Sequence, residues 1–221
     1  MVLLIHHTTS PFGRKIRLQM SEKKMLFALR SEEPWNLSPE IYKLNPAGSL
    51  PIYLNDGKII SSHYAISEYL EEAYSQIPLI FGTLEQKAEI RRLIHWFDDK
   101  FYREVYRNIV IEKVYKRFAQ GSSPDSMVLK AGLNNLGFHL EYIEWLFEKH
   151  AYLAGEELTL ADLTAAAHIS IIDYLGDVPW DSFPLTKLWY SKIKSRPSFK
   201  DILKDTIAGI LPSRNYANLD F

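Results

Sequence analysis

Apolar residues fill nearly every position between Leu160 and Ile172. A helix that is apolar on all sides is a buried helix. Thr159 and Asp162, at its start, have the T-x-x-D spacing of a capping box, in which a hydroxyl and a carboxylate each accept a backbone N–H. We therefore expect the buried central helix of a helical domain to begin here, with Thr159 and Asp162 as its structural cap.

The first 76 residues combine short β-branched apolar runs with helical patterns, and an Asn55-Asp56-Gly57 turn predicts a hairpin. The order β-α-β-α-β-β-α is typical of an α/β domain with helices packed on a mixed sheet. We expect strands at 2–6, 26–29, 50–54 and 58–60, and helices at about 11–24, 39–44 and 64–74.

After this domain, residues 77–83 form the expected linker, and every later pattern has helical spacing. We expect an all-helical domain at 84–207 and a polar, irregular tail at 208–221. The predicted fold class is thus α/β plus all-α. The expected helices of the second domain are 84–118, 127–149, the capped helix from 160, 185–193 and 197–205.

Composition narrows the possible functions. The 221 residues carry a formal net charge of −1 and no cysteine. The absence of cysteine excludes disulfides, thiolate zinc sites and a cysteine nucleophile. Without a basic field we expect no nucleic-acid partner, and without a run of 18 apolar residues no membrane insertion. The histidines lack metal spacing, so we expect no metal site, and we expect a cytoplasmic protein.

Four motifs resemble those of the cytosolic glutathione S-transferase superfamily, and together they cover nearly the whole chain. The resemblance implies a thioredoxin-like N-terminal domain followed by the helical C-terminal domain of that family. The motifs are Ser10-Pro11 with Arg14 to Arg17, Asn45-Pro46-Ala47-Gly48-Ser49-Leu50-Pro51, Asp56-Gly57 with Ser61-Ser62 and Ala65 to Leu70, and Ala154-Gly155 with Thr159 to Asp162. The third is similar to the family's D-G-x-x-L-x-E-S-x-A-I-x-x-Y-L.

These residues suit the recognition of a thiol tripeptide such as glutathione. A strand that follows a cis-proline leaves backbone groups free to pair with an extended peptide, which assigns this role to Leu50 and Pro51. The next helix would offer N–H donors at Ser61 and Ser62 to a carboxylate. Ser10 is the candidate catalytic residue, because its hydroxyl could stabilise a thiolate. Equally, Ser10 could be an ordinary helix N-cap, and Thr9 could replace it.

Two departures from the family pattern weaken the enzymatic interpretation. Ser61 stands where the family usually has an acid, and Ser49 stands where it often has Lys or Gln. Charge-assisted hydrogen bonds are worth about 1.5–3 kcal/mol against about 1 kcal/mol for neutral ones. We therefore expect glutathione to bind weakly or not at all.

Further stretches resemble a bacterial branch of the superfamily whose members bind the division protein FtsZ. They are residues 96–105, 112–117, 173–180 and 216–221. The preferred hypothesis is a divergent division factor that binds FtsZ. The alternative is an active transferase that conjugates glutathione to small electrophiles with Ser10. The resemblance also implies a homodimer with the 84–118 helix partly at its interface.

The tail offers a candidate partner-binding segment. Tyr216, Leu219 and Phe221 are spaced apolar residues at a chain end with few charges. Such an end can dock on its own domain or bind a partner as an extended peptide. Both alternatives stay open at the level of sequence.

Overall fold

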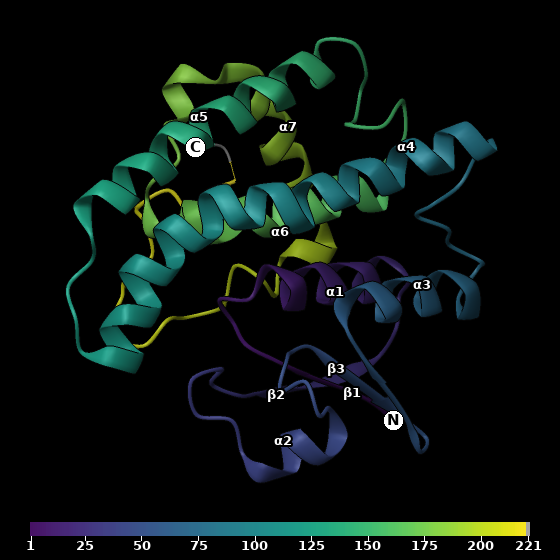
Figure 1. Ribbon diagram of the computed structural model, residues 1–221. Coiled ribbons are helices and arrows are strands. Elements are labelled where there is room, and N and C mark those ends of the chain that lie inside the picture. The colour runs from purple at the N-terminus through teal and green to yellow at the C-terminus, as the bar shows by residue number, and fades with distance from the viewer. Residues whose placement is uncertain (220–221) are drawn as a thin grey trace. The chain divides into compact units, whose positions relative to one another are not determined.

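The computed structural model describes residues 1–219 of the chain. These form two compact units, Met1–Leu79 and the chain from Ile80 onward (Figure 1). The first is an α/β unit and the second is helical, as the sequence predicts. None of the described helices has both the length and the apolar character needed to cross a membrane.

The first unit is a four-stranded mixed sheet with the order β2-β1-β3-β4. Strand β1 is parallel to β2 and antiparallel to β3, and β3 and β4 form an antiparallel hairpin. Asp56 and Gly57 both have positive φ in the hairpin turn, as expected for this turn sequence. The strands are β1 Val2–His6, β2 Phe27–Ser31, β3 Ile52–Asn55 and β4 Lys58–Ser61, and the helices are α1 Pro11–Glu22, α2 Pro39–Leu44 and α3 His63–Ala73.

Two apolar clusters lie against this sheet. Residues of α1 and α3, such as Ile16 and Leu70, pack with Leu4 and Tyr53 of the strands. A smaller cluster joins Ile41 of α2 to the other strand residues. Helices α1 and α3 therefore cover one face of the sheet and α2 the other (Figure 1).

The second unit contains α-helices, a π-helix and short 3₁₀ turns. The prediction of a helix at 197–205 is wrong beyond its first turn, because only three residues form a 3₁₀ turn and irregular turns follow. Another 3₁₀ turn lies between α6 and α7. The elements are α4 Leu84–His95, η1 Trp96–Gln120, α5 Ser126–Phe147, α6 Leu160–Leu175, η2 Trp180–Ser182, α7 Pro184–Lys194 and η3 Pro197–Phe199.

The predicted cap of the central helix is confirmed. Every residue of α6 from Leu160 to Tyr174 is buried, and Asp162 Oδ2 accepts the Thr159 N–H at 2.9 Å and its hydroxyl at 3.0 Å. The other oxygen, Oδ1, accepts the Leu153 N–H at 2.9 Å and the Trp189 indole N–H at 3.0 Å. Burial raises the pKa of Asp162, although these hydrogen bonds oppose the rise. One carboxylate thus joins the start of α6 to the preceding loop and to α7.

The helix expected at 84–118 is continuous but changes its winding at Trp96. Beyond that residue η1 is a π-helix of 25 residues, with i→i+5 hydrogen bonds that end at Gly121 N–H···O=C Lys116. Its buried residues recur mostly at spacings of three and four positions, so one side of η1 faces the core; they are Phe97, Phe101, Val105, Tyr106, Ile109, Val110, Glu112 and Val114.

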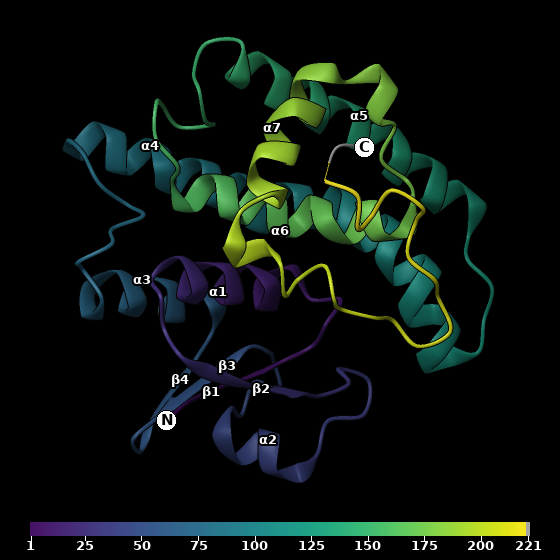
Figure 2. The ribbon, with the colours of Figure 1, turned by 180° about the vertical axis from the view of Figure 1, so that it is seen from behind.

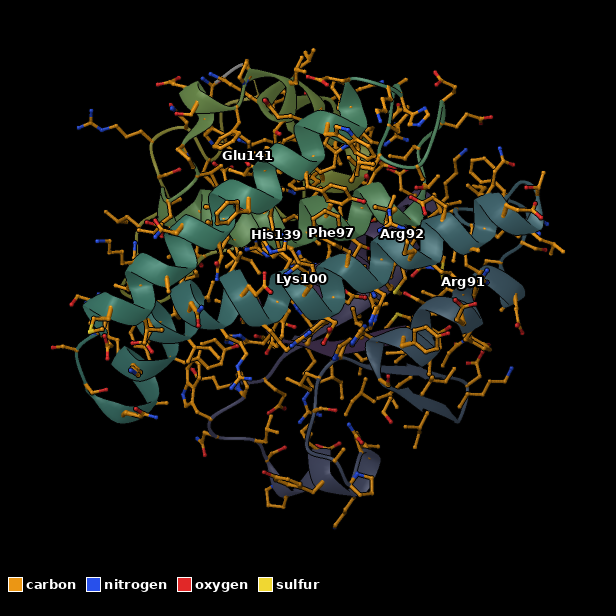
Figure 3. The ribbon with its side chains drawn as sticks, turned by 45° about the horizontal axis from the view of Figure 1, so that its top comes forward. Arg91, Arg92, Phe97, Lys100, His139 and Glu141 are labelled. Atoms are coloured by element: carbon orange, nitrogen blue, oxygen red, sulfur yellow. The ribbon has the colours of Figure 1, made fainter. Side chains whose placement is uncertain are left out.

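Helix α5 packs closely along η1. A Cβ on Gly132 would lie 2.8 Å from Cβ of Asn108, so glycine permits the close approach. His139 projects from α5 toward η1 (Figure 3), where its Nδ1 accepts the Trp96 indole N–H at 3.0 Å and its Nε2 lies 3.1 Å from Glu104 Oε2. Since Nδ1 is an acceptor, the imidazole proton resides on Nε2 and is donated to Glu104. Burial lowers the pKa of His139 to about 4.

Replacing Asp162 by Ala should lower the free energy of unfolding by about 3 kcal/mol, because the N–H groups of Leu153, Thr159 and Trp189 would lose a buried acceptor. Urea denaturation measures the change. Thr83→Ala, at the exposed capping box of α4, is the matched control and should cost about 1 kcal/mol. An unchanged urea midpoint for Asp162→Ala would contradict this account of the α6 start.

The buried imidazole predicts a loss of stability in mild acid. Between pH 6.5 and about 4 the unfolded chain protonates His139 while the folded chain does not, so stability falls as the pH falls through this window. The full loss is at most about 3 kcal/mol. His139→Gln should flatten the pH dependence of urea unfolding, and His95→Gln on the exposed side of α4 should leave it unchanged. Parallel pH curves for His139→Gln and the unsubstituted protein would refute the prediction.

Candidate functional site

Three segments of the first unit meet at one end of its sheet. Ile5 pairs with Ile52, and Ile52 pairs with Ser61, so the end of β1, the start of β3 and the end of β4 lie side by side. The predicted site residues follow directly from these positions: Leu50 and Pro51 precede β3, Ser61 and Ser62 close β4, and Ser10 follows β1. The structure therefore brings together all five residues predicted for the glutathione site.

Ser10 is the N-cap of α1. Its Oγ accepts the Gly13 N–H at 3.2 Å, and its backbone C=O accepts the Arg14 N–H at 3.0 Å. The side chain is 8% exposed, and its hydroxyl hydrogen has no acceptor within residues 1–219. The capping role is confirmed, and the thiolate role stays a prediction that the free hydroxyl hydrogen permits.

The Leu50-Pro51 peptide bond is cis, as the resemblance implies. The turn before it is held by buried Asn45, whose Nδ2 donates to the Ser49 backbone O at 2.8 Å and to Ser49 Oγ at 3.0 Å. Ser49 therefore shapes the turn instead of offering a charge to a ligand.

The helix after β4 begins at His63, one residue earlier than expected. Ser61 is the last residue of β4, and Ser62 is the N-cap residue with φ 74°, a backbone conformation unusual for a residue other than glycine. Ser62 therefore stands at the N-terminus of α3, whereas Ser61 lies within β4, and the donor role of both residues stays a prediction.

The first turns of α1 and α3 are joined by side chains that the sequence interpretation missed. The Phe12 ring stacks on the His63 ring with centroids 4.1 Å apart and an interplanar angle of 14°. Lys15 Nζ lies 3.1 Å from His63 Nδ1, and since the ammonium can only donate, Nδ1 is the acceptor. An aromatic ring and an imidazole thus stand at the helix end where a ligand carboxylate was expected.

The tail residues differ in accessibility. Tyr216 is 1% exposed; its hydroxyl donates to Ile202 O at 3.1 Å and its ring meets Tyr174 edge-on at 5.0 Å. Leu219 is 39% exposed, and Phe221 lies outside the described residues. Tyr216 therefore anchors the tail to its own unit, and partner binding by this segment stays a prediction.

Comparisons with known proteins agree with this arrangement. Residues 9–73 match the model of the glutathione S-transferase N-terminal domain, and residues 110–197 match that of the C-terminal domain. FtsZ-localized protein A of Caulobacter vibrioides is 40% identical over 222 residues, which cover 99% of this chain and 97% of that protein. The chain belongs to the glutathione S-transferase family.

Solved structures of family members superpose on the whole chain. A glutathione S-transferase from Rhodospirillum rubrum F11 has a TM-score of 0.98 at 46% identity and full coverage of both chains. FzlA from C. crescentus has a TM-score of 0.96 at 40% identity, with 100% and 99% coverage.

The family motif can now be placed on the structure. Counted back from Ala65-Ile66, the E-S pair of D-G-x-x-L-x-E-S-x-A-I falls on Ser62 and His63, one residue after the Ser61-Ser62 pair expected above. The start of α3 at His63 agrees with this register. The acidic position is therefore Ser62, and the serine position holds the His63 ring.

Introducing the family's Glu-Ser pair at positions 62 and 63 should improve glutathione binding. The double variant Ser62→Glu/His63→Ser should bind reduced glutathione at least tenfold more tightly, because a charge-assisted hydrogen bond of about 1.5–3 kcal/mol becomes available. Ser61→Glu, one position earlier in β4, is the matched control and should bring no gain. Calorimetric titration measures both, and an equal gain from Ser61→Glu would overturn the register.

Proposed function

We propose that this chain is a cytoplasmic cell-division factor that binds FtsZ and makes weak or no use of glutathione. The observation that supports it is the 40% identity, over nearly the full length of both chains, with a protein named for its localisation to FtsZ. The similarity to the FzlA structure extends over the same length.

The geometry at α3 supports the part of the proposal that concerns glutathione. Ser62 provides no charge at the acidic position, Ser49 is engaged by Asn45, and His63 stacks on Phe12 at the helix start. Each of these features removes or covers a contact that the carboxylate or ammonium ends of the tripeptide would use.

An active transferase is the second candidate, and Ser10 favours it. Its hydroxyl stands at the N-terminus of α1, where the helix dipole stabilises an anion, and its hydrogen is uncommitted within residues 1–219. Under this alternative the chain conjugates glutathione to small electrophiles, and Ser10→Ala abolishes the activity.

The proposal includes a homodimer. Family members usually pair through the α/β domain of one subunit and the first two long helices of the other, here α4–η1 and α5. Helix α5 carries Phe138 and Trp145, which are 69% and 49% exposed, and large exposed aromatic side chains are typical of protein interfaces. Tyr106 of the same region is buried within its own unit and donates to Tyr115.

Sedimentation with GTP-assembled FtsZ tests the proposal. We expect the chain in the pellet only when FtsZ polymers are present, and no conjugation of a dinitrobenzene electrophile above that of Ser10→Ala. Deleting residues 217–221 keeps the Tyr216 anchor, so it should leave the melting temperature nearly unchanged while weakening sedimentation. Tyr216→Ala should instead cost about 3 kcal/mol of stability through the lost buried ring.

Three outcomes would each reject a part of this account. A chain that stays in the supernatant with assembled FtsZ is not a direct FtsZ-binding protein. Conjugation that disappears in Ser10→Ala would establish the transferase in its place. Unchanged sedimentation after the deletion would remove the tail from the FtsZ interface and leave the proposal itself standing.

A further inference from the structure

A cavity of about 460 Å³ lies within the helical unit. Its lining residues come from η1, the loop after it, the end of α6 and the tail. They are Lys113, Arg117, Ser122, Ser123, Pro124, Leu175 and Ile210. The volume falls in the range of about 300–1,000 Å³ that small-molecule sites occupy.

The cavity is built from two stretches that lie far apart in the sequence. Residues 112–117 supply the two cations, and residues 173–180 supply Leu175 and Asp177, the carboxylate that pairs with Lys113. These two stretches lie about 60 positions apart in the sequence. The fold therefore brings them together around a single hollow.

The walls of the cavity are fixed by hydrogen bonds. The loop of Ser122 to Pro124 is tied to η1 at both ends, since Ser122 N–H donates to Lys116 O at 3.1 Å and Asp125 N–H donates to Glu112 Oε2 at 2.8 Å. Such a wall needs no ordering when a ligand arrives, which favours binding.

The tail wall is fixed in the same way. The Tyr174 hydroxyl accepts the Ile207 N–H at 3.0 Å and donates to Ile210 O at 2.8 Å. In Figure 2 this tail turn passes beside the C-terminal end of η1, where Gly209 lies against Phe118.

The charges around the cavity do not balance. Lys113 Nζ lies 2.7 Å from Asp177 Oδ2, and Lys116 Nζ lies 2.7 Å from Glu112 Oε2. Both lysines are therefore paired with a carboxylate. Arg117 is exposed, and within residues 1–219 it has no carboxylate partner and contacts only the Phe118 ring. One uncompensated guanidinium therefore stands at the rim, with the Ser123 hydroxyl on the opposite loop.

We propose that this cavity binds a small organic anion, a carboxylate that carries an apolar chain. The carboxylate pairs with Arg117, which can donate two parallel hydrogen bonds, and accepts a further hydrogen bond from the Ser123 hydroxyl. The apolar chain lies against Leu175, Ile210 and Pro124. Both halves of the ligand are required, because the lining contains both an uncompensated cation and apolar side chains.

Three probes test the carboxylate and the apolar chain of the ligand separately. Octanoate has both, acetate has only the carboxylate, and octan-1-ol has only the apolar chain. We expect octanoate to bind, and acetate and octan-1-ol each to bind at least tenfold more weakly, in calorimetric titrations of the full chain. Amide chemical-shift changes with octanoate should centre on residues 113–123 and 207–211.

Charge variants locate the site. Arg117→Ala should weaken octanoate binding at least tenfold, and Arg117→Lys should retain part of the affinity. Arg107→Ala removes another exposed η1 arginine that does not line the cavity, and it should bind octanoate as the unsubstituted chain does. The proposal is overturned if octanoate fails to bind, if Arg117→Ala binds it unchanged, or if the shifts centre elsewhere. Because none of these readouts involves FtsZ or glutathione, their failure is distinct from failure of the proposed function.

Discussion

The helical unit depends on two buried carboxylates, one at each end of α6. Asp162 accepts four hydrogen bonds and joins the start of the helix to Leu153, in the loop before it, and to α7. Asp173 accepts from Trp180, Tyr190 and Lys194, and Lys194 also donates to Asn215 O. Burial raises the pKa of Asp173 and lowers that of Lys194, against their mutual attraction. Such buried groups are tolerated only when every neighbour supplies its hydrogen bond, so they fix one arrangement of α6, α7 and the tail.

Where local chemistry alone decides, sequence reasoning succeeds. The T-x-x-D spacing predicts the α6 cap, because a capping box needs only residues three positions apart. The Asn55-Asp56-Gly57 turn predicts the β3–β4 hairpin, since few residues adopt positive φ at two successive positions. The family motifs likewise predict that Ser10, Pro51 and Ser62 meet, because they specify the sheet order on which that meeting depends.

Where hydrogen bonding depends on packing, the same reasoning fails. Apolar residues on the 84–118 helix predict a helix but not its winding, because the spacing of four from Phe97 to Phe101, Val105 and Ile109 is also that of an ordinary α-helix face. The tail shows the same limit. Tyr216 carries no signal that separates an anchor from a partner contact, and only the position of Tyr174 and Ile202 places its ring inside.

The candidate glutathione site illustrates how one residue of register changes a functional argument. With Ser61 at the acidic position, the family serine is retained and only a charge is lost. With Ser62 there, the serine itself is replaced by His63, whose ring is held by Phe12 and Lys15 at the start of α3. The first case predicts a weakened transferase site, and the second a site whose carboxylate end is covered. The start of α3 at His63 agrees with the second case, which underlies our proposal of weak or absent glutathione use. The hydrogen bonds of Asp162 and Asp173 all lie within the second unit, so a change at the start of α3 leaves them in place.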